Sequence, residues 1–239
     1  MSKYKLKNEA GSERASLYIY GDIVDDQEGS FYELFGLAGV VSPTAFRKAL
    51  EDVGDKPLDV YISSDGGDVP SGLAIANMLA RRTAQTVGHV DGWAASIAGI
   101  IFLACTERHM PGNTFLMLHR PWISGFAGNI DDFEKAVEFL RTTGDTLLNF
   151  INARLRSESD KETVEANYKA EHWYNADEAS AFFDIQLDAN QGYKTVAKCK
   201  SYKMPAAMAK NFENINQTES KKEAVQAALK NSFKAIYDL

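Results

Sequence analysis

The sequence predicts an α/β fold in which parallel strands alternate with helices. Three observations carry this prediction. Apolar runs of strand length occur at 16–20, 57–64, 85–92 and 113–119, helical patterns lie between them at 42–54, 70–82 and 94–105, and 45% of the 239 residues are hydrophobic. Alternating strands and helices form a layered sheet through right-handed crossovers. This apolar content is enough for a core without disulfides.

Local signals define several of these elements. Ser42 and Pro43 predict the start of the first helix, as N-cap and first residue. The 94–105 helix is almost wholly apolar and ends in Cys105, which we expect to be a small core residue. A short helix over 175–183 and a last strand over 193–199 complete the predicted domain.

A long amphipathic helix is predicted over 129–156, because apolar residues there recur mostly at intervals of three, four or seven. Asn129 can cap it, and Asp131 and Asp132 suit the positive end of its dipole. At about 1.5 Å per residue it would be roughly 40 Å long. Such a helix either covers the core or projects from the domain to pack on a partner.

The predicted organisation has three parts. Residues 1–15 form a flexible N-terminal segment, 16–199 form the domain, and 200–239 form a polar linker and a C-terminal amphipathic helix. A capping-box pattern at 220–223 precedes an apolar stripe in that last helix.

Charge and composition exclude several classes. A net charge of −7 argues against a nucleic-acid-binding protein. We see no signal-peptide pattern and no apolar run of the roughly 18 residues that a membrane span needs. Two cysteines, Cys105 and Cys199, indicate no disulfide framework. We therefore expect a cytoplasmic protein without membrane or nucleic-acid partners.

Ser96, within GWAASIAG, is the candidate nucleophile, and it needs a base and donors for an oxyanion. His119 ends an apolar strand, where functional residues of α/β sheets gather. The N–H of Ile97 can act as a donor at a helix start, and a second donor can come from SSDGGDV, residues 63–69.

The other histidines give weaker signals. His89 lies in a strand pattern and is interpreted as structural, while His109 precedes a turn and is expected to be exposed. The spacing of histidines and cysteines predicts no metal site. The Gly66-Gly67 pair lacks the residues of a phosphate loop, so we expect no cofactor.

Four motifs resemble, in order and spacing, the proteolytic subunit of the Clp protease family. They are YISSDGGDVPSGLAIANML, GWAASIAG, MLHRP and EHWYNADEASAFFD, within residues 16–195. The resemblance implies the ClpP/crotonase-like fold, a layered β-α-β superhelix with a long handle helix. It also implies a serine endopeptidase that acts on polypeptide substrates.

The resemblance assigns roles to individual residues. Ser96 falls on the family's nucleophile and His119 on its general base. Glu171 falls where the family usually has the triad aspartate, with Asp177 and Glu178 as lower-ranked alternatives. Gly67 and Ile97 fall on the two backbone oxyanion donors.

The resemblance also implies an assembly. The 129–156 helix matches the family's handle, and residues 122–129 match the strand-like segment that leads into it and lines the substrate channel. The family forms homo-oligomeric rings of six or seven subunits, usually stacked in pairs. The start of this chain does not show the family's pore-loop segment, which makes an AAA+ unfoldase a doubtful partner.

Three features resemble phage or prophage relatives more than other members of the family: Glu171, the WYNADEA motif and the C-terminal tail. This resemblance implies processing of capsid or scaffold proteins. Two alternatives remain open. The chain can be a catalytically inactive ring or shell subunit, or another crotonase-superfamily enzyme acting on acyl-CoA thioesters. Signal peptide peptidases use a lysine base and a membrane anchor, and we see no anchor.

Overall fold

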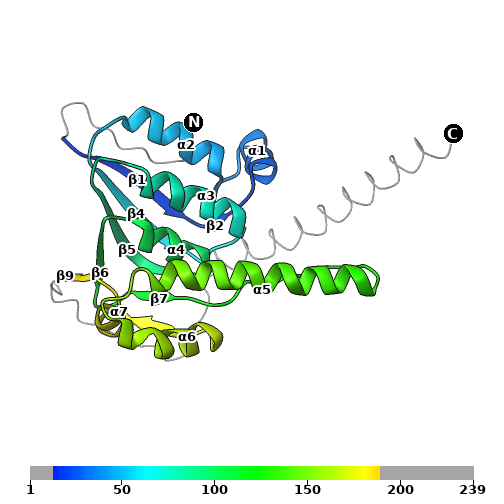
Figure 1. The fold of residues 1–239 in the computed structure, drawn as a ribbon. Helices are drawn as coiled ribbons and strands as arrows, with labels where there is room; N and C mark the ends of the chain where they lie inside the picture. Colours follow the sequence, from blue (N-terminus) through cyan, green and yellow to red (C-terminus); the bar gives the residue numbers. More distant parts are fainter. Residues whose placement is uncertain (1–12, 189–239) are drawn as a thin grey trace, which may run out of the picture. The chain divides into compact units, whose positions relative to one another are not determined.

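The computed structural model describes residues 13–188, so the predictions for 193–199, Cys199 and the 200–239 tail lie outside the described residues (Figure 1). The strands are β1 (Ala15–Tyr20), β2 (Asp22–Ile23), β3 (Val40–Val41), β4 (Leu58–Ser64), β5 (Thr86–Ala95), β6 (Glu107–Pro111), β7 (Phe115–Met117), β8 (Trp173–Asn175) and β9 (Gln186–Asp188). The helices are α1 (Asp26–Leu34), α2 (Pro43–Val53), α3 (Val69–Ala80), α4 (Ile97–Ala104), α5 (Ile130–Asn152), α6 (Lys161–Lys169) and α7 (Ala176–Phe182), with a 3₁₀ turn at Glu158–Asp160.

The main sheet is parallel over its path β1-β4-β5-β6-β9. Strand β5 is long enough to pair twice on one side. Its first part pairs with β6, and Trp93–Ala95 at its end pair with β7. Strand β8 then pairs with β7 in the antiparallel direction. The end of β5 therefore lies beside segments from the middle and the end of the described chain.

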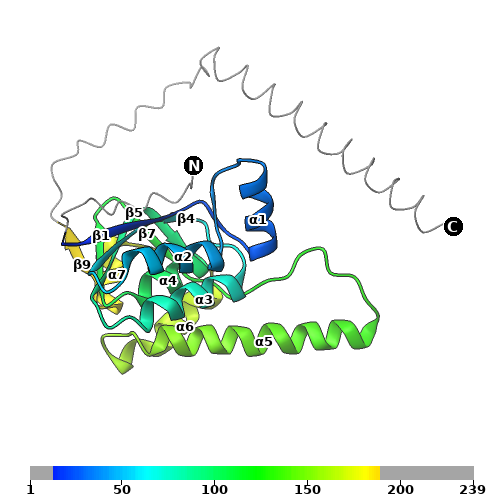
Figure 2. The same ribbon diagram turned by 90° about the horizontal axis from the view of Figure 1, so that it is seen from above.

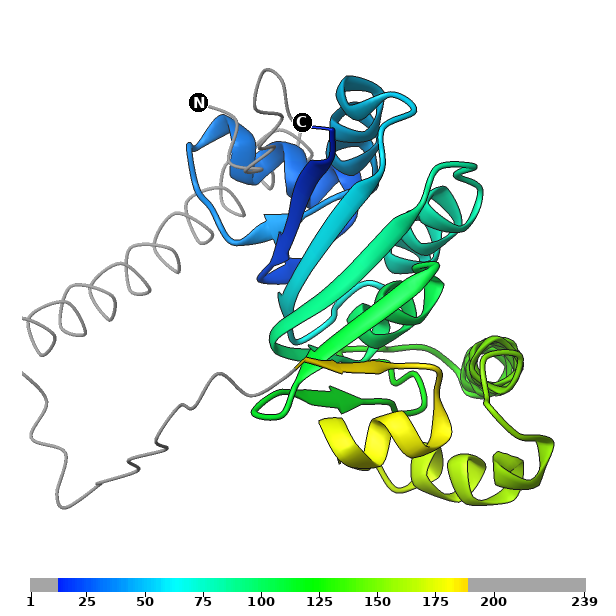
Figure 3. The same cartoon turned by 90° about the vertical axis from the view of Figure 1, so that its left-hand side faces the viewer.

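Helices α2, α3 and α4 lie on one face of the sheet (Figure 3). All eight residues of α4 are buried, as its apolar sequence predicts, and Cys105 directly after it is a core residue. Partly exposed rings line up in register across the other face, one from each of four strands: Tyr18, Tyr61, His89 and His109. The two faces of the sheet thus have different chemistry.

Helix α2 begins at Pro43 with Ser42 as N-cap residue, as predicted. The capping hydrogen bond comes from elsewhere, because the carboxylate of Asp26 in α1 accepts from both the N–H and the hydroxyl of Thr44, each at 2.8 Å. Helix α1, which sequence periodicity did not predict, therefore caps α2 from a distance in the chain.

Helix α5 is a handle-like helix of 23 residues, about 35 Å long, and Asn129 caps it as predicted. Asn129 and Asp132 form a capping box, which was not predicted. It ends at Asn152, so the predicted extension to 156 is wrong; Leu155 instead forms a bridge with Phe183. Its C-terminal part buries Gly144, Leu147 and Ile151, while its N-terminal part extends beyond the sheet (Figure 2). The C-terminal half of the helix thus covers the core, and the N-terminal half projects from the domain; both predicted roles apply.

The strand-like segment expected at 122–129 is not assigned as a strand. These residues lie outside any helix or strand, Gly125 has φ +66°, and Trp122 is 72% exposed. Strand β6 and helix α6 were not predicted, because their sequences are too polar to show a clear apolar period. None of the helices within residues 13–188 combines the length and apolar character that crossing a bilayer requires.

Candidate active site

Ser96 forms the sharp turn between β5 and α4. Its backbone has φ +56° and ψ −128°, a conformation that costs a residue other than glycine about 1–3 kcal/mol. Two hydrogen bonds hold the turn: the Ser96 N–H donates to the Met117 carbonyl at 2.9 Å, and the Gly99 N–H donates to the Ser96 carbonyl at 3.0 Å. The fold therefore fixes Ser96 in a strained position at the start of a buried helix.

His119 lies close to Ser96 because their strands are neighbours. Residues Ala95 and Met117 are opposite one another in the parallel β5–β7 pair, so the chain beyond each strand emerges at the same edge. The distance from His119 Nε2 to Ser96 Oγ is 2.7 Å, and the histidine side chain is 11% exposed. An imidazole protonated on Nδ1 can accept the hydroxyl proton in this geometry.

Glu171 lies on the other side of the imidazole. It occupies the turn between α6 and β8, with φ +56°, and β8 pairs with β7. Its Oε1 is 3.6 Å from His119 Nδ1, within ion-pair range but longer than a hydrogen bond. His119 Nδ1 is buried and has no hydrogen-bond partner within the described residues. A small movement of the exposed Glu171 side chain would supply one.

The Gly66-Gly67 loop follows β4 and packs on the Ser96 turn. Both glycines have positive φ, and a Cβ on Gly66 would lie 2.7 Å from that of Ser96. Strand β2 holds the loop, because the Ile23 N–H donates to the Gly66 carbonyl and the Asp68 N–H donates to the Ile23 carbonyl, each at 2.7 Å. The N–H of Gly67, which lies between these two residues, takes no part in this pairing. Ile97, the other predicted N–H donor, is the first residue of α4.

An open groove of about 390 Å³ passes Ser96 and His119. The glycine loop, Trp122 and Ser124 contribute to its walls, together with the carboxylates Asp22 and Asp65. A smaller pocket opens beside the same two residues. Its remaining lining is apolar apart from one tyrosine: Val69, Ile97, Ile100, Leu118, Pro121, Leu147 and Tyr168.

Sequence reasoning missed three contributors to this region. Ile23 lies in a two-residue strand, and Tyr168 lies in the unpredicted α6, where its hydroxyl donates to the Gly144 carbonyl at 3.3 Å. Burial raises the pKa of Tyr168, so its hydroxyl stays neutral. Leu147 belongs to the predicted apolar stripe of the long helix, but that stripe gave no sign that it faces a pocket.

Other candidates are placed elsewhere. Glu178 lies 2.6 Å from His172 Nε2, so this alternative carboxylate is already paired with another histidine. His89 lies in β5 as expected. His109 precedes a turn at 112–113, as predicted, but the expectation that it is exposed is wrong, because it lies in β6 with its side chain 20% exposed. Burial raises the pKa of Cys105 to about 12, so this thiol is not a competing nucleophile.

The segment that contains these site residues is similar in sequence to known proteins. The sequence model described as Clp protease matches residues 49–182, a segment that contains Ser96, His119, Glu171 and both predicted N–H donors. The ATP-dependent Clp protease proteolytic subunit 2 of Borreliella burgdorferi is 33% identical over 171 residues, covering 70% of this chain and 78% of the relative. The ATP-dependent Clp protease proteolytic subunit of Bdellovibrio bacteriovorus is 34% identical over 93 residues, covering 37% of this chain and 44% of the relative.

One solved structure extends the comparison to the fold. A ClpP1 mutant from Listeria monocytogenes matches with a TM-score of 0.55 at 20% identity, covering 74% of this chain and 92% of that chain. The predicted ClpP-like α/β architecture is thereby confirmed, although likeness at this identity concerns the fold alone.

Proposed function

The chain belongs to the Clp protease family, and from this premise we propose that it is a serine endopeptidase that hydrolyses peptide bonds through Ser96, His119 and Glu171. The 2.7 Å distance between His119 Nε2 and Ser96 Oγ is the observation that carries the proposal. A serine needs an adjacent base to become a nucleophile, and this pair meets that need at the edge of an open groove.

The proposed reaction begins when the Ser96 hydroxyl attacks the substrate carbonyl and His119 Nε2 takes its proton. The N–H groups of Gly67 and Ile97 stabilise the oxyanion that forms. His119 then gives its proton to the leaving amine, which departs and leaves an acyl-enzyme on Ser96. Water hydrolyses that ester in the same way, and Glu171 stabilises the imidazolium in both steps.

The groove suggests how a polypeptide binds. Residues 122–129 form neither helix nor strand, so their backbone groups can pair with an extended peptide lying in the groove beside Trp122 and Ser124. The small pocket beside Ser96 has a mostly apolar lining and a volume of about 10 Å³, room for a single water molecule. An apolar side chain next to the scissile bond would match this lining and would have to widen the pocket to enter it. The acyl-CoA alternative gains no support from the family and relatives that match.

We also propose that the chain forms a homo-oligomeric ring, as the family resemblance implies. Large apolar side chains on the projecting half of α5 support this, because Ile130 is 74% exposed and Phe133 is 51% exposed. Ring size, an unfoldase partner and a role in phage capsid or scaffold processing stay predictions.

A covalent probe and a peptide substrate test the enzyme proposal together. We expect a fluorophosphonate to label the wild-type protein but not Ser96→Ala, and a peptide with leucine before the scissile bond to be cleaved. His119→Ala should abolish turnover without changing the sedimentation of the protein. Absence of labelling in assembled wild-type protein would overturn the proposal and favour the inactive ring subunit.

A further inference from the structure

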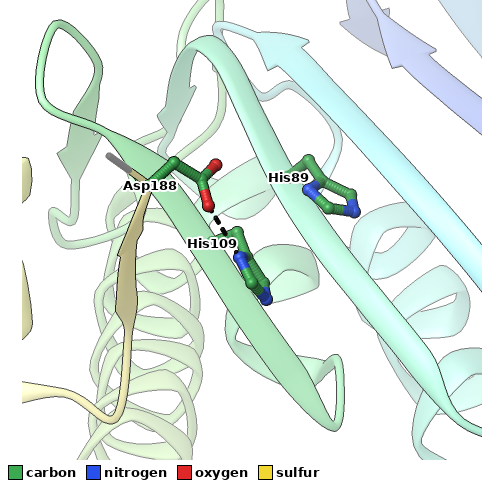
Figure 4. A group of neighbouring side chains, drawn as sticks. All are labelled: His89, His109 and Asp188. Carbon is green, nitrogen blue, oxygen red and sulfur yellow. Dashed lines mark hydrogen bonds and ion pairs between the residues drawn. The ribbon is translucent and has the colours of Figure 1, made fainter. Parts of the chain in front are cut away.

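A second cluster of chemically active side chains lies on the face of the sheet that carries the partly exposed rings. His89 comes from β5, His109 from β6 and Asp188 from β9, three adjacent strands (Figure 4). His89 and His109 are register partners, and their ring centroids are 5.2 Å apart. The cluster could not be found from spacing, because the two histidines lie in different strands and Asp188 follows His109 by 79 residues.

Each of these residues offers one ligand atom, and the three atoms lie within 4.8 Å of one another. His109 Nδ1 and Asp188 Oδ1 are 2.9 Å apart. Two ligands on a tetrahedral zinc ion stand about 3.3 Å apart, as bond lengths of about 2.0 Å require. We propose that His89, His109 and Asp188 form a binding site for a divalent transition-metal ion of the zinc type.

A neighbouring carboxylate supports this assignment. His89 Nε2 lies 3.4 Å from Asp59 Oδ1, which leaves Nδ1 as the nitrogen available to a metal. Metal-bound histidines usually donate their other ring N–H to a carboxylate, which fixes the tautomer and the ring orientation. Asp59 is itself held by Arg14, whose Nε and Nη2 donate to its two oxygens at 3.0 and 2.7 Å. The side chain of Tyr61 stacks on the His89 ring at 4.8 Å.

The cluster is accessible and has the right donors for this class of ion. The exposed fractions of the side chains are 23% for His89, 20% for His109 and 43% for Asp188, so an ion can enter and the ligands can adjust. Two imidazoles and one carboxylate favour zinc, cobalt or nickel over magnesium, which prefers oxygen ligands. Three protein ligands leave a fourth position for water.

Metal binding would fasten β9 to the sheet. This strand contributes three residues, which pair only with β6 among the described strands. An ion bound by His89, His109 and Asp188 together would connect β9 to β5 as well as to β6. The proposal is thus a stabilising clip at the sheet edge, separate from the groove beside Ser96.

Metal titration of the untagged, full-length protein, first stripped with a chelator, tests the site. We expect calorimetry with Zn²⁺ to show binding that is lost in His109→Gln and strongly weakened in His89→Gln. Co²⁺ should give the visible absorption of a four-coordinate site in the wild type and not in His109→Gln. Mg²⁺ at the same concentration should not compete. Asp188→Asn provides a second variant if His109→Gln does not fold.

His119→Ala is the matched control, because it removes a histidine outside the cluster that also lies near a carboxylate. It should bind Zn²⁺ and Co²⁺ as the wild type does. Absence of Zn²⁺ binding in the wild type would overturn the proposal, as would binding that survives in a His89→Gln, His109→Gln double variant. Loss of the cobalt signal in His119→Ala would also overturn it, by moving the metal to the groove. None of these readouts depends on peptide hydrolysis.

Discussion

The site depends on one imidazole whose two nitrogens face different partners. His119 Nε2 is within hydrogen-bond distance of Ser96, but the buried Nδ1 is 3.6 Å from the Glu171 carboxylate. A buried N–H without an acceptor costs about 1–3 kcal/mol. That cost favours closure of Glu171 onto the ring, and it would increase when the imidazole becomes positively charged in the proposed reaction. The side chain of Glu171 is one methylene longer than that of an aspartate and lies on an exposed turn, so it can make this movement.

Glu171→Gln tests this role. We expect kcat to fall by up to about 10⁴, because an amide can hold the wrong tautomer and cannot balance the imidazolium charge. KM for a peptide should change little, since Glu171 does not line the groove. Steady-state kinetics on a fluorogenic peptide measure both constants.

Glu178→Gln is the matched control, because this carboxylate is paired with His172 and not with His119. It should retain near-normal kcat. If Glu171→Gln behaves like Glu178→Gln, Glu171 is a bystander and the site functions as a Ser–His pair.

At the scale of elements, apolar periodicity predicted what is buried and failed where polar contacts define the element. Strands β1 and β4 alternate buried and partly exposed residues, and α4 is apolar throughout, so all three were predicted. Helix α1 has no buried residue, and the hydrogen bonds between Asp26 and Thr44 help to link it to α2. Contacts of this kind join residues far apart in the chain and leave no periodic pattern.

The Asp26 contact makes the stability of this corner depend on pH. Burial raises the pKa of Asp26, but hydrogen bonds from Thr44 and Ser42 and the charge of Arg47 together outweigh it and hold the pKa below its usual value of 3.8. A carboxylate whose pKa is lowered by folding stabilises the protein above its unfolded-state pKa and loses this effect as the pH falls through the folded-state pKa. The wild type should therefore be more stable than Asp26→Asn at pH 7, and the difference should begin to fall below about pH 4 and shrink further as the pH drops.

Urea unfolding of both proteins between pH 7 and pH 3 measures this difference. Glu33→Gln makes the same charge change on an exposed position of α1 and should give a stability difference that varies less with pH. Parallel stability curves for the wild type and Asp26→Asn would contradict the prediction.

At the scale of the whole molecule, Ser96 and His119 are 23 residues apart and Glu171 follows His119 by 52 residues (171 − 119), and only the sheet brings them together. The resemblance supplied Ser96, His119 and Glu171 because each lies in a recognisable motif. It could not supply Tyr168 or Ile23, whose motifs are not distinctive, or the His89–His109 pair, which depends on strand register. Periodicity predicts which face of an element is buried, but not which residues of different elements meet.

Periodicity also could not show what covers the projecting half of α5, whose apolar stripe is only partly covered within residues 13–188. Ile130, Phe133 and Val137 lie on one face at intervals of three and four, and Val137 is 45% exposed. Phe133 packs on Phe126 of the segment that leads into the helix, at 5.2 Å between ring centroids. Exposed apolar surface of this kind is unfavourable in water and is typical of an interface.

We expect an Ile130→Asp, Val137→Asp double variant to dissociate, because two buried charges without partners would destabilise the interface by several kcal/mol. Analytical ultracentrifugation at micromolar concentration should show a ring-sized species for the wild type and a smaller one for the variant. Glu138→Gln, on the same helix, changes a charge without altering the apolar stripe and should assemble normally. A wild-type protein that sediments as a monomer would show that the stripe has another partner, and the ring proposal would then be wrong.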